Sequence, residues 1–167
     1  MKKLIKTLAI IVGIILIFLA GSAFSRYWII NHESYNLRGG AITDMVELIN
    51  AEREKVGGSP LTYSFQLSES AQLKCDDMIK NNYFAHYSPS GTSPWSFMAQ
   101  AGYRYTFAGE NISQAHGDFM SMDAFMLSPS HKANILSTKF THVGIGRCYT
   151  YDYDLVVQHF GTPLVIK

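Results

Sequence analysis

The chain has 167 residues, of which 47% are hydrophobic and 13% aromatic. This length and composition favour one globular domain with a packed core and exclude a disordered chain. Ten of the 14 basic residues lie beyond residue 26 together with all 13 acidic residues, so that part of the chain carries a formal charge of −3. A domain with this charge is not expected to bind nucleic acid.

Residues 7–25 form an uncharged apolar run that follows three lysines. At ~1.5 Å per residue the run is about 28 Å long, close to the hydrocarbon thickness of a bilayer. The lysines before it, against Arg26 alone after it, place the N-terminus in the cytoplasm and everything beyond outside the cell. Residues 1–26 are therefore predicted to be a retained single-pass membrane anchor. The alternative is a signal peptide cleaved near the small residues 21–23, which would make the protein secreted.

Residues 27–40 show no sustained period, so we interpret them as a short stalk before a domain that covers residues 41–167. Helices are expected in the first part of this domain, since apolar residues recur there at spacings of three and four. They run from about Ala41 to Gly57, from a cap at Ser68 or Ser70 to about Asn81, from Pro94 to Gly102, and through Met122 and Phe125 to Ser128.

The C-terminal part changes to a period of two. Residues alternate from Val143 to Tyr149, and after a turn at Asp152 the run 155–160 has the pattern of a partner strand. Helices followed by a hairpin predict the α+β class with a central antiparallel sheet. Gly144 and Gly146, inside the first strand, indicate close approach of another part of the backbone.

Four segments stand out in order along the domain: residues 48–53 (LINAER), 60–63 (PLTY) followed by Leu67 and Ala71, 83–86 (YFAH) with 109–112 (GENI), and 128–136 (SPSHKANIL) leading into 143–146. Together they resemble the motifs of the CAP domain, the fold of cysteine-rich secretory proteins, antigen 5 and pathogenesis-related proteins, in its prokaryotic form. The resemblance implies a three-layer α-β-α sandwich. Tyr63 departs from the family pattern, which usually has tryptophan there. Three asparagines inside these motifs are expected to brace loops by hydrogen bonds: Asn50, Asn111 and Asn134.

Members of this family bring two histidines and two acidic residues together in a cleft that can hold a divalent cation. The resemblance carries His86 and His131 onto the histidines and Glu110 onto one acid, but no carboxylate stands near Ser128, where the second acid would fall. Two imidazoles and one carboxylate suffice for zinc and leave a fourth position open. We therefore expect a cleft of His86, Glu110 and His131, with zinc or another divalent metal as its cofactor. In the alternative, each of the three has a local structural role without metal.

Other residues allow further interpretations. Cys75 and Cys148 form the one possible intramolecular disulfide, which export permits. Because Cys75 stands where the family usually has alanine, two buried thiols are the equal alternative. A serine nucleophile at Ser88 or Ser130, or a Cys75–His86 dyad, is less favoured, since a catalytic triad is defined by spatial roles and not by adjacency in sequence.

The leading functional hypothesis is a cell-surface binding module that uses the cleft to contact an envelope lipid, glycan or protein. A secreted metal-assisted or serine-type hydrolase is the alternative, and a structural or adhesive role is the third. The missing second acid argues against catalysis, because acid–base work generally uses two tuned groups.

Overall fold

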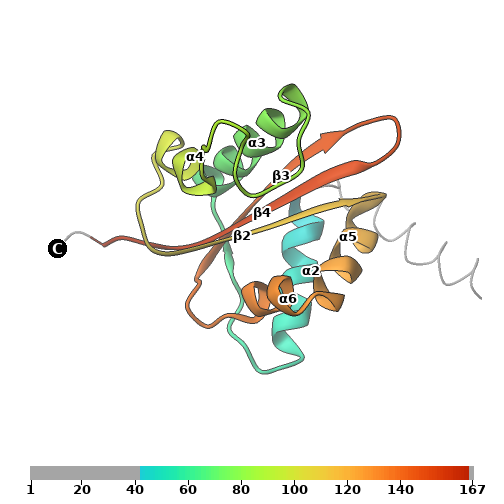
Figure 1. Cartoon of the computed structure of the whole chain (residues 1–167). Helices are drawn as coiled ribbons and strands as arrows, with labels where there is room; N and C mark the ends of the chain where they lie inside the picture. Colours follow the sequence, from blue (N-terminus) through green and yellow to red (C-terminus); the bar gives the residue numbers. More distant parts are fainter. Residues whose placement is uncertain (1–41, 166–167) are drawn as a thin grey trace, which may run out of the picture. The chain divides into compact units, whose positions relative to one another are not determined.

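The computed structural model describes residues 42–165 (Figure 1). In chain order the elements are α2 (Ile42–Glu54), β1 (Thr62–Tyr63), α3 (Phe65–Lys80), α4 (Pro94–Gln100), β2 (Tyr105–Ala115), α5 (Gly117–Leu127), α6 (Pro129–Leu136), β3 (His142–Tyr149) and β4 (Asp154–Pro163). The predicted anchor and stalk lie outside the described residues. Within residues 42–165, no helix combines the length and apolarity needed to cross a bilayer.

The strands of the described part form one mixed sheet in the order β1-β3-β4-β2. β4 pairs antiparallel with both β3 and β2, whereas the short β1 runs parallel to β3. The α+β class is confirmed, but the prediction of a wholly antiparallel sheet is wrong. The physical reason is that a long, largely helical connection joins β1 to β3, and such a crossover permits parallel pairing where a hairpin does not.

The two faces of the sheet carry different helices, as Figure 1 shows. Val156 and Phe160 of β4 pack with α2, α5 and α6, while Leu155 and Val157 of the same strand pack with α3. This alternation follows from the two-residue repeat of a strand. Helices therefore cover both faces of the sheet, and each face has its own apolar cluster.

Glycines bring α3 unusually close to β3. A Cβ atom on Gly144 would lie 2.1 Å from the amide nitrogen of Ser68, and one on Gly146 would lie 2.3 Å from the carbonyl carbon of Ala71. Real Cβ atoms do not approach other heavy atoms so closely. The predicted close approach of another part of the backbone is thus confirmed.

The N-terminus of α3 corrects another expectation. Ser64 caps this helix, and its hydroxyl oxygen accepts a 3.3 Å hydrogen bond from the amide of Leu67. Ser68 and Ser70, the predicted caps, lie inside the helix and face the sheet. Ser68 Oγ accepts a 2.9 Å hydrogen bond from the amide of Ile145. A buried serine can mimic a cap in the sequence because both positions favour a short polar side chain.

Polar side chains tie the outer elements together. The buried Arg53 donates 2.8 Å hydrogen bonds to the carbonyl oxygens of Ile135 and Ser137, at the end of α6. A cation at the C-terminal end of a helix also complements the helix dipole. Asn50 exchanges two hydrogen bonds with the backbone of Leu61, at 2.7 and 3.0 Å. The bracing role predicted for this asparagine is confirmed.

A disulfide joins Cys75 of α3 to Cys148 of β3, with the two Cα atoms 6.0 Å apart. Of the two alternatives left open by the sequence, the structure has the bonded pair. Because Cys75 then carries no free thiol, the Cys75–His86 dyad is excluded as a nucleophilic site.

Candidate functional site: a histidine–glutamate cluster

Glu110 lies in the middle of β2, where strand pairing places it opposite His159 of β4. Like Ile112 two residues further on, it faces the side of the sheet covered by α3. Only 5% of the residue is exposed. A carboxylate so deeply buried is stable only when other groups satisfy its charge and its hydrogen bonds.

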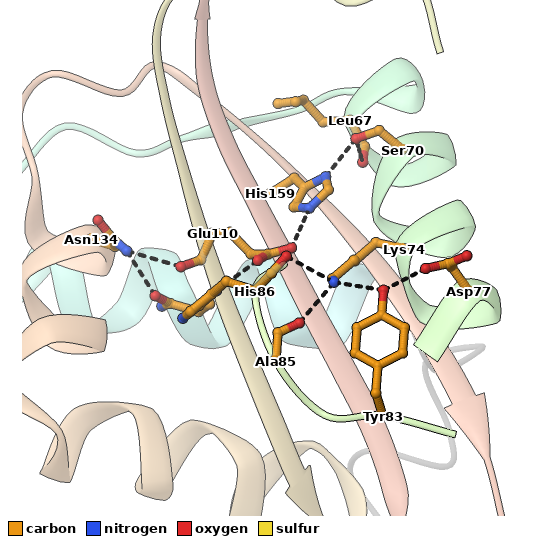
Figure 2. A network of polar contacts seen from close by, with 11 residues as sticks. Leu67, Ser70, Lys74, Asp77, Tyr83, Ala85, His86, Glu110, Asn134 and His159 are labelled. Atoms are coloured by element: carbon orange, nitrogen blue, oxygen red, sulfur yellow. Dashed lines mark hydrogen bonds and ion pairs between the residues drawn. The ribbon is translucent and has the colours of Figure 1, made fainter. Parts of the chain in front are cut away.

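Both oxygens of Glu110 have histidine partners (Figure 2). Oε1 lies 2.6 Å from Nδ1 of His86, and Oε2 lies 2.9 Å from Nε2 of His159. On its far side, His159 places Nδ1 2.6 Å from the hydroxyl oxygen of Ser70 on α3. A buried hydrogen-bonded chain therefore runs from α3 through β4 and β2 and ends at His86. These residues, with His131, are called the histidine–glutamate cluster below.

The carboxylate fixes the tautomers of both histidines. An ionised carboxylate only accepts hydrogen bonds, so Nδ1 of His86 and Nε2 of His159 must both carry protons. In neutral His86 the other ring nitrogen, Nε2, then has a free lone pair. The His86 side chain is 49% exposed, against 2% for Glu110. Glu110 thus orients a solvent-accessible imidazole whose Nε2 can bind a ligand.

Lys74 holds the backbone segment that carries His86. Its ammonium group has no exposed surface and donates hydrogen bonds to Tyr83 Oη (3.0 Å), Ala85 O (2.8 Å) and His86 O (2.9 Å). These three bonds use all the protons of the ammonium group. The Tyr83 hydroxyl in turn donates to the carboxylate of Asp77. Figure 2 shows the lysine reaching from α3 to this segment.

Electrostatics favour a charged carboxylate next to His86. Burial alone would raise the pKa of Glu110, but hydrogen bonds from His159 and His86 and the charge of Lys74 outweigh it and leave the pKa below its usual value. The hydrogen bond to Glu110 raises the pKa of His86, although burial and the charge of Lys74 act in the opposite direction. The pair therefore has a stronger tendency to ionise than two isolated side chains.

His131 lies on α6 and is oriented by other contacts. Its ring packs edge-on against Phe125, with ring centroids 5.3 Å apart, and its carbonyl oxygen accepts a 3.1 Å hydrogen bond from Asn111. Burial lowers the pKa of His131, and the nearby His86 lowers it further. Among the described residues, no hydrogen bond joins the His131 ring to Glu110. Asn134 bonds to the Glu110 carbonyl oxygen at 3.1 Å and to Asn111 at 2.9 Å, so both asparagines brace this region as predicted.

The arrangement does not fit the three-ligand zinc site expected from the resemblance. Both Glu110 oxygens are engaged by ring nitrogens, and in residues 42–165 no group of three or more His, Cys, Asp or Glu side chains is placed to hold a metal ion. In this geometry Glu110 is a partner of the histidines rather than a ligand, as carboxylates behind metal-binding imidazoles often are. Zinc coordination by all three groups requires Glu110 to release a histidine, and it stays a prediction.

The serines proposed as nucleophiles have other partners. Ser88 Oγ lies 2.8 Å from Ser90 Oγ, and Ser130 Oγ lies 3.2 Å from Ser128 Oγ, so neither contacts a histidine. The hydrogen-bonded chain Ser70–His159–Glu110 has the same order of groups as a serine–histidine–acid catalytic triad. Neither Ser70 nor His159 has any exposed surface, however, so no substrate can reach this hydroxyl.

Sequence reasoning missed two central residues, His159 and Lys74. His159 interrupts the apolar run 155–160, and it could have been noticed as a histidine on the same strand face as Leu155 and Val157. Lys74 falls inside the apolar stripe of α3, between Ala71 and Met78. A lysine at such a position is almost never buried without dedicated partners.

Solved structures of similar fold exist. An extracellular protein containing an SCP domain from Bacillus anthracis str. Ames matches with a TM-score of 0.66 and 27% identity, over 72% of this chain and 39% of that one. An outer surface protein from Borrelia burgdorferi matches with a TM-score of 0.68 and 22% identity, over 73% of this chain and 92% of that one. The architecture is therefore that of an SCP-type domain.

The family model of the cysteine-rich secretory protein family, CAP, matches residues 46–160, and the chain belongs to this family. Uncharacterized protein YkwD of Bacillus subtilis (strain 168) is 45% identical over 103 residues, which cover 61% of this chain and 40% of that protein. Uncharacterized membrane protein YlbC of the same strain is 28% identical over 65% of this chain and 33% of its own length. The matches thus span less than half of these relatives.

Proposed function

We propose that this CAP domain is an extracytoplasmic binding module, held at the membrane by residues 7–25, in which His86 and His131 contact an envelope lipid, glycan or protein. The observation that carries the proposal is the contact of His86 with Glu110. A buried carboxylate holds one nitrogen of a half-exposed imidazole and leaves the other for a ligand.

The position of His86 favours recognition over nucleophilic catalysis. Its free nitrogen can accept a hydrogen bond from a ligand hydroxyl or amide, and when protonated the ring can pair with an anion. Within residues 42–165, no serine hydroxyl or cysteine thiol lies within hydrogen-bond distance of this ring, as a Ser–His or Cys–His nucleophile would need.

Anchoring and outward orientation are supported by the sequence pattern and by the nature of the relatives. The lysines precede the apolar run, and two of the similar proteins are described as an extracellular protein and an outer surface protein. A module tethered just outside a membrane meets envelope components at high effective concentration, so modest intrinsic affinity is sufficient.

The test uses residues 36–167, which lack the proposed anchor, and compares His86→Ala with the parent for sedimentation with isolated cell-envelope fractions. We expect a much smaller fraction of the His86→Ala variant than of the parent to sediment with the envelope. His116→Ala is the matched control, because His116 is an exposed histidine at the start of α5 and outside the cluster. Equal loss in both variants, or unchanged binding in His86→Ala, would refute the role of the histidine–glutamate cluster.

A further inference from the structure

A separate pocket of about 190 Å³ lies where the C-terminal end of α3 meets β2 and β4. It is lined by Met78, Ile79, Asn82, Tyr83, Phe84, Gln114, Tyr153 and Leu155. This lining includes neither His86 nor Glu110, and none of these side chains is a carboxylate, an amine, a guanidinium or an imidazole. A pocket without charge suits a neutral ligand. Its volume suits a single ring, since drug-sized ligands occupy roughly 300–1,000 Å³.

The lining combines two kinds of contact. Aliphatic and aromatic side chains offer a surface for C–H groups, and the amides of Asn82 and Gln114 each offer donors and an acceptor. Neither amide has a hydrogen-bond partner in the part of the chain that the structure describes. A sugar ring has a matching chemistry, with an apolar C–H face and hydroxyls around its edge. An acetamido group adds a methyl for the apolar lining and an amide for the two side-chain amides.

One wall of the pocket is held in place before any ligand arrives. Tyr83 lines the pocket, and its hydroxyl is bonded to the buried Lys74 and to Asp77. Asn82 has a positive φ of 50°, a left-handed conformation that asparagine tolerates better than most residues. A preorganised wall loses little conformational freedom on binding.

We propose that this pocket binds a neutral N-acetylated sugar residue of an extracellular glycan. The lining residues of the pocket include neither partner of the His86–Glu110 contact, and the proposal does not depend on what His86 binds.

The experiment is an NMR titration of the full chain, in a detergent without sugar groups, with a neutral trisaccharide of N-acetylglucosamine. We expect the largest shifts at the side-chain amides of Asn82 and Gln114. Asn82→Gly removes an amide while keeping a backbone conformation that glycine adopts freely. Asn82→Gly and Gln114→Ala should each weaken the affinity at least about fivefold, the loss expected for one hydrogen bond.

Gln100→Ala is the control, because Gln100 is an exposed amide at the end of α4 outside the pocket. The affinity of this variant for the trisaccharide should equal that of the parent. Absent shifts, or equal affinity in the parent, Asn82→Gly and Gln114→Ala, would overturn the proposal. Shifts centred on His86 that vanish in His86→Ala but persist in Gln114→Ala would also overturn it, while supporting the function proposed for the histidine–glutamate cluster.

Discussion

The ammonium group of Lys74, which has no exposed surface, donates a 2.9 Å hydrogen bond to the carbonyl oxygen of His86. It thereby fastens the loop that presents the His86 ring to the body of α3. No ligand can touch this lysine, yet the orientation of the most exposed histidine of the cluster depends on it. Lys74 is therefore a positioning residue.

Lys74→Met should lower the free energy of unfolding by about 2–3 kcal/mol, because Tyr83 Oη, Ala85 O and His86 O all lose a charged hydrogen-bond donor. Urea unfolding measures this change. Lys80→Met is the control, since Lys80 is exposed in the last turn of the same helix and surface substitutions usually change stability by less than about 0.5 kcal/mol. An equally small effect of both substitutions would contradict the positioning role.

The His86–Glu110 pair should make the free energy of unfolding decrease at both low and high pH. The pKa of His86 is raised, so its contribution is fully present below its ordinary value of 6.5 and is lost as pH rises through the raised pKa. The pKa of Glu110 is lowered, so its contribution is fully present above its ordinary value of 4.5 and is lost as pH falls through the lowered pKa. The pair should stabilise the fold most between pH 4.5 and 6.5. Urea midpoints measured against pH check this window.

Glu110→Gln provides the matched control for that window. Without the carboxylate, the His86 pKa measured by NMR should fall toward or below its ordinary value, since the hydrogen bond that raises it is weakened. His131 should titrate below 6.5 in the parent, because burial disfavours its charged form. A raised pKa of His86 that survives in Glu110→Gln would show that another group causes it.

Zinc should bind weakly if the hydrogen bonds of Glu110 persist in solution. Two imidazoles alone cannot reach the roughly 10–16 kcal/mol of structural zinc sites in small domains. Isothermal calorimetry should therefore give an affinity well short of nanomolar, reduced further in His86→Ala and in His131→Ala. Nanomolar affinity that is lost in Glu110→Gln would instead establish the three-ligand site inferred from the family resemblance.

Reducing the Cys75–Cys148 bond should lower the free energy of unfolding by about 2–4 kcal/mol, the usual range for a disulfide. The bond closes a long loop, with a sequence separation of 73. Guanidinium unfolding with and without dithiothreitol measures the loss. The double variant Cys75→Ala/Cys148→Ala should be insensitive to the reductant. Two free thiols in the unreduced, denatured protein would restore the alternative of buried cysteines.

Periodicity was sufficient to predict α2, α3, α4, α5 and the β3–β4 hairpin, but not α6 or the outer strands. β2 escapes prediction because three of its buried side chains, Glu110, Asn111 and Ser113, are polar. Those of Glu110 and Asn111 are satisfied by neighbours distant in sequence. β1 has two residues, too few for any alternation to appear. Because β1 was missed, its parallel pairing with β3, which makes the sheet mixed, was missed as well.

The cluster was predictable only in part, for a similar reason. The family motifs located His86, Glu110 and His131, but the sequence could not reveal that Glu110 uses both oxygens on histidines. That arrangement depends on the register between β2 and β4, which sets His159 opposite Glu110. Register is set by the pairing of two strands, so a motif within one segment does not specify it.

The glycine contacts between α3 and β3 determine where this domain can accept new sequence. Any side chain at position 144 or 146 would push α3 away from the sheet, and with it Ser70 and Lys74. A combinatorial library seeking new ligands should therefore hold these two codons constant and randomise the exposed loop around His86. With both glycines kept, α3 stays in place against β3. The ligand specificity of the loop can then change without compensating substitutions in the core.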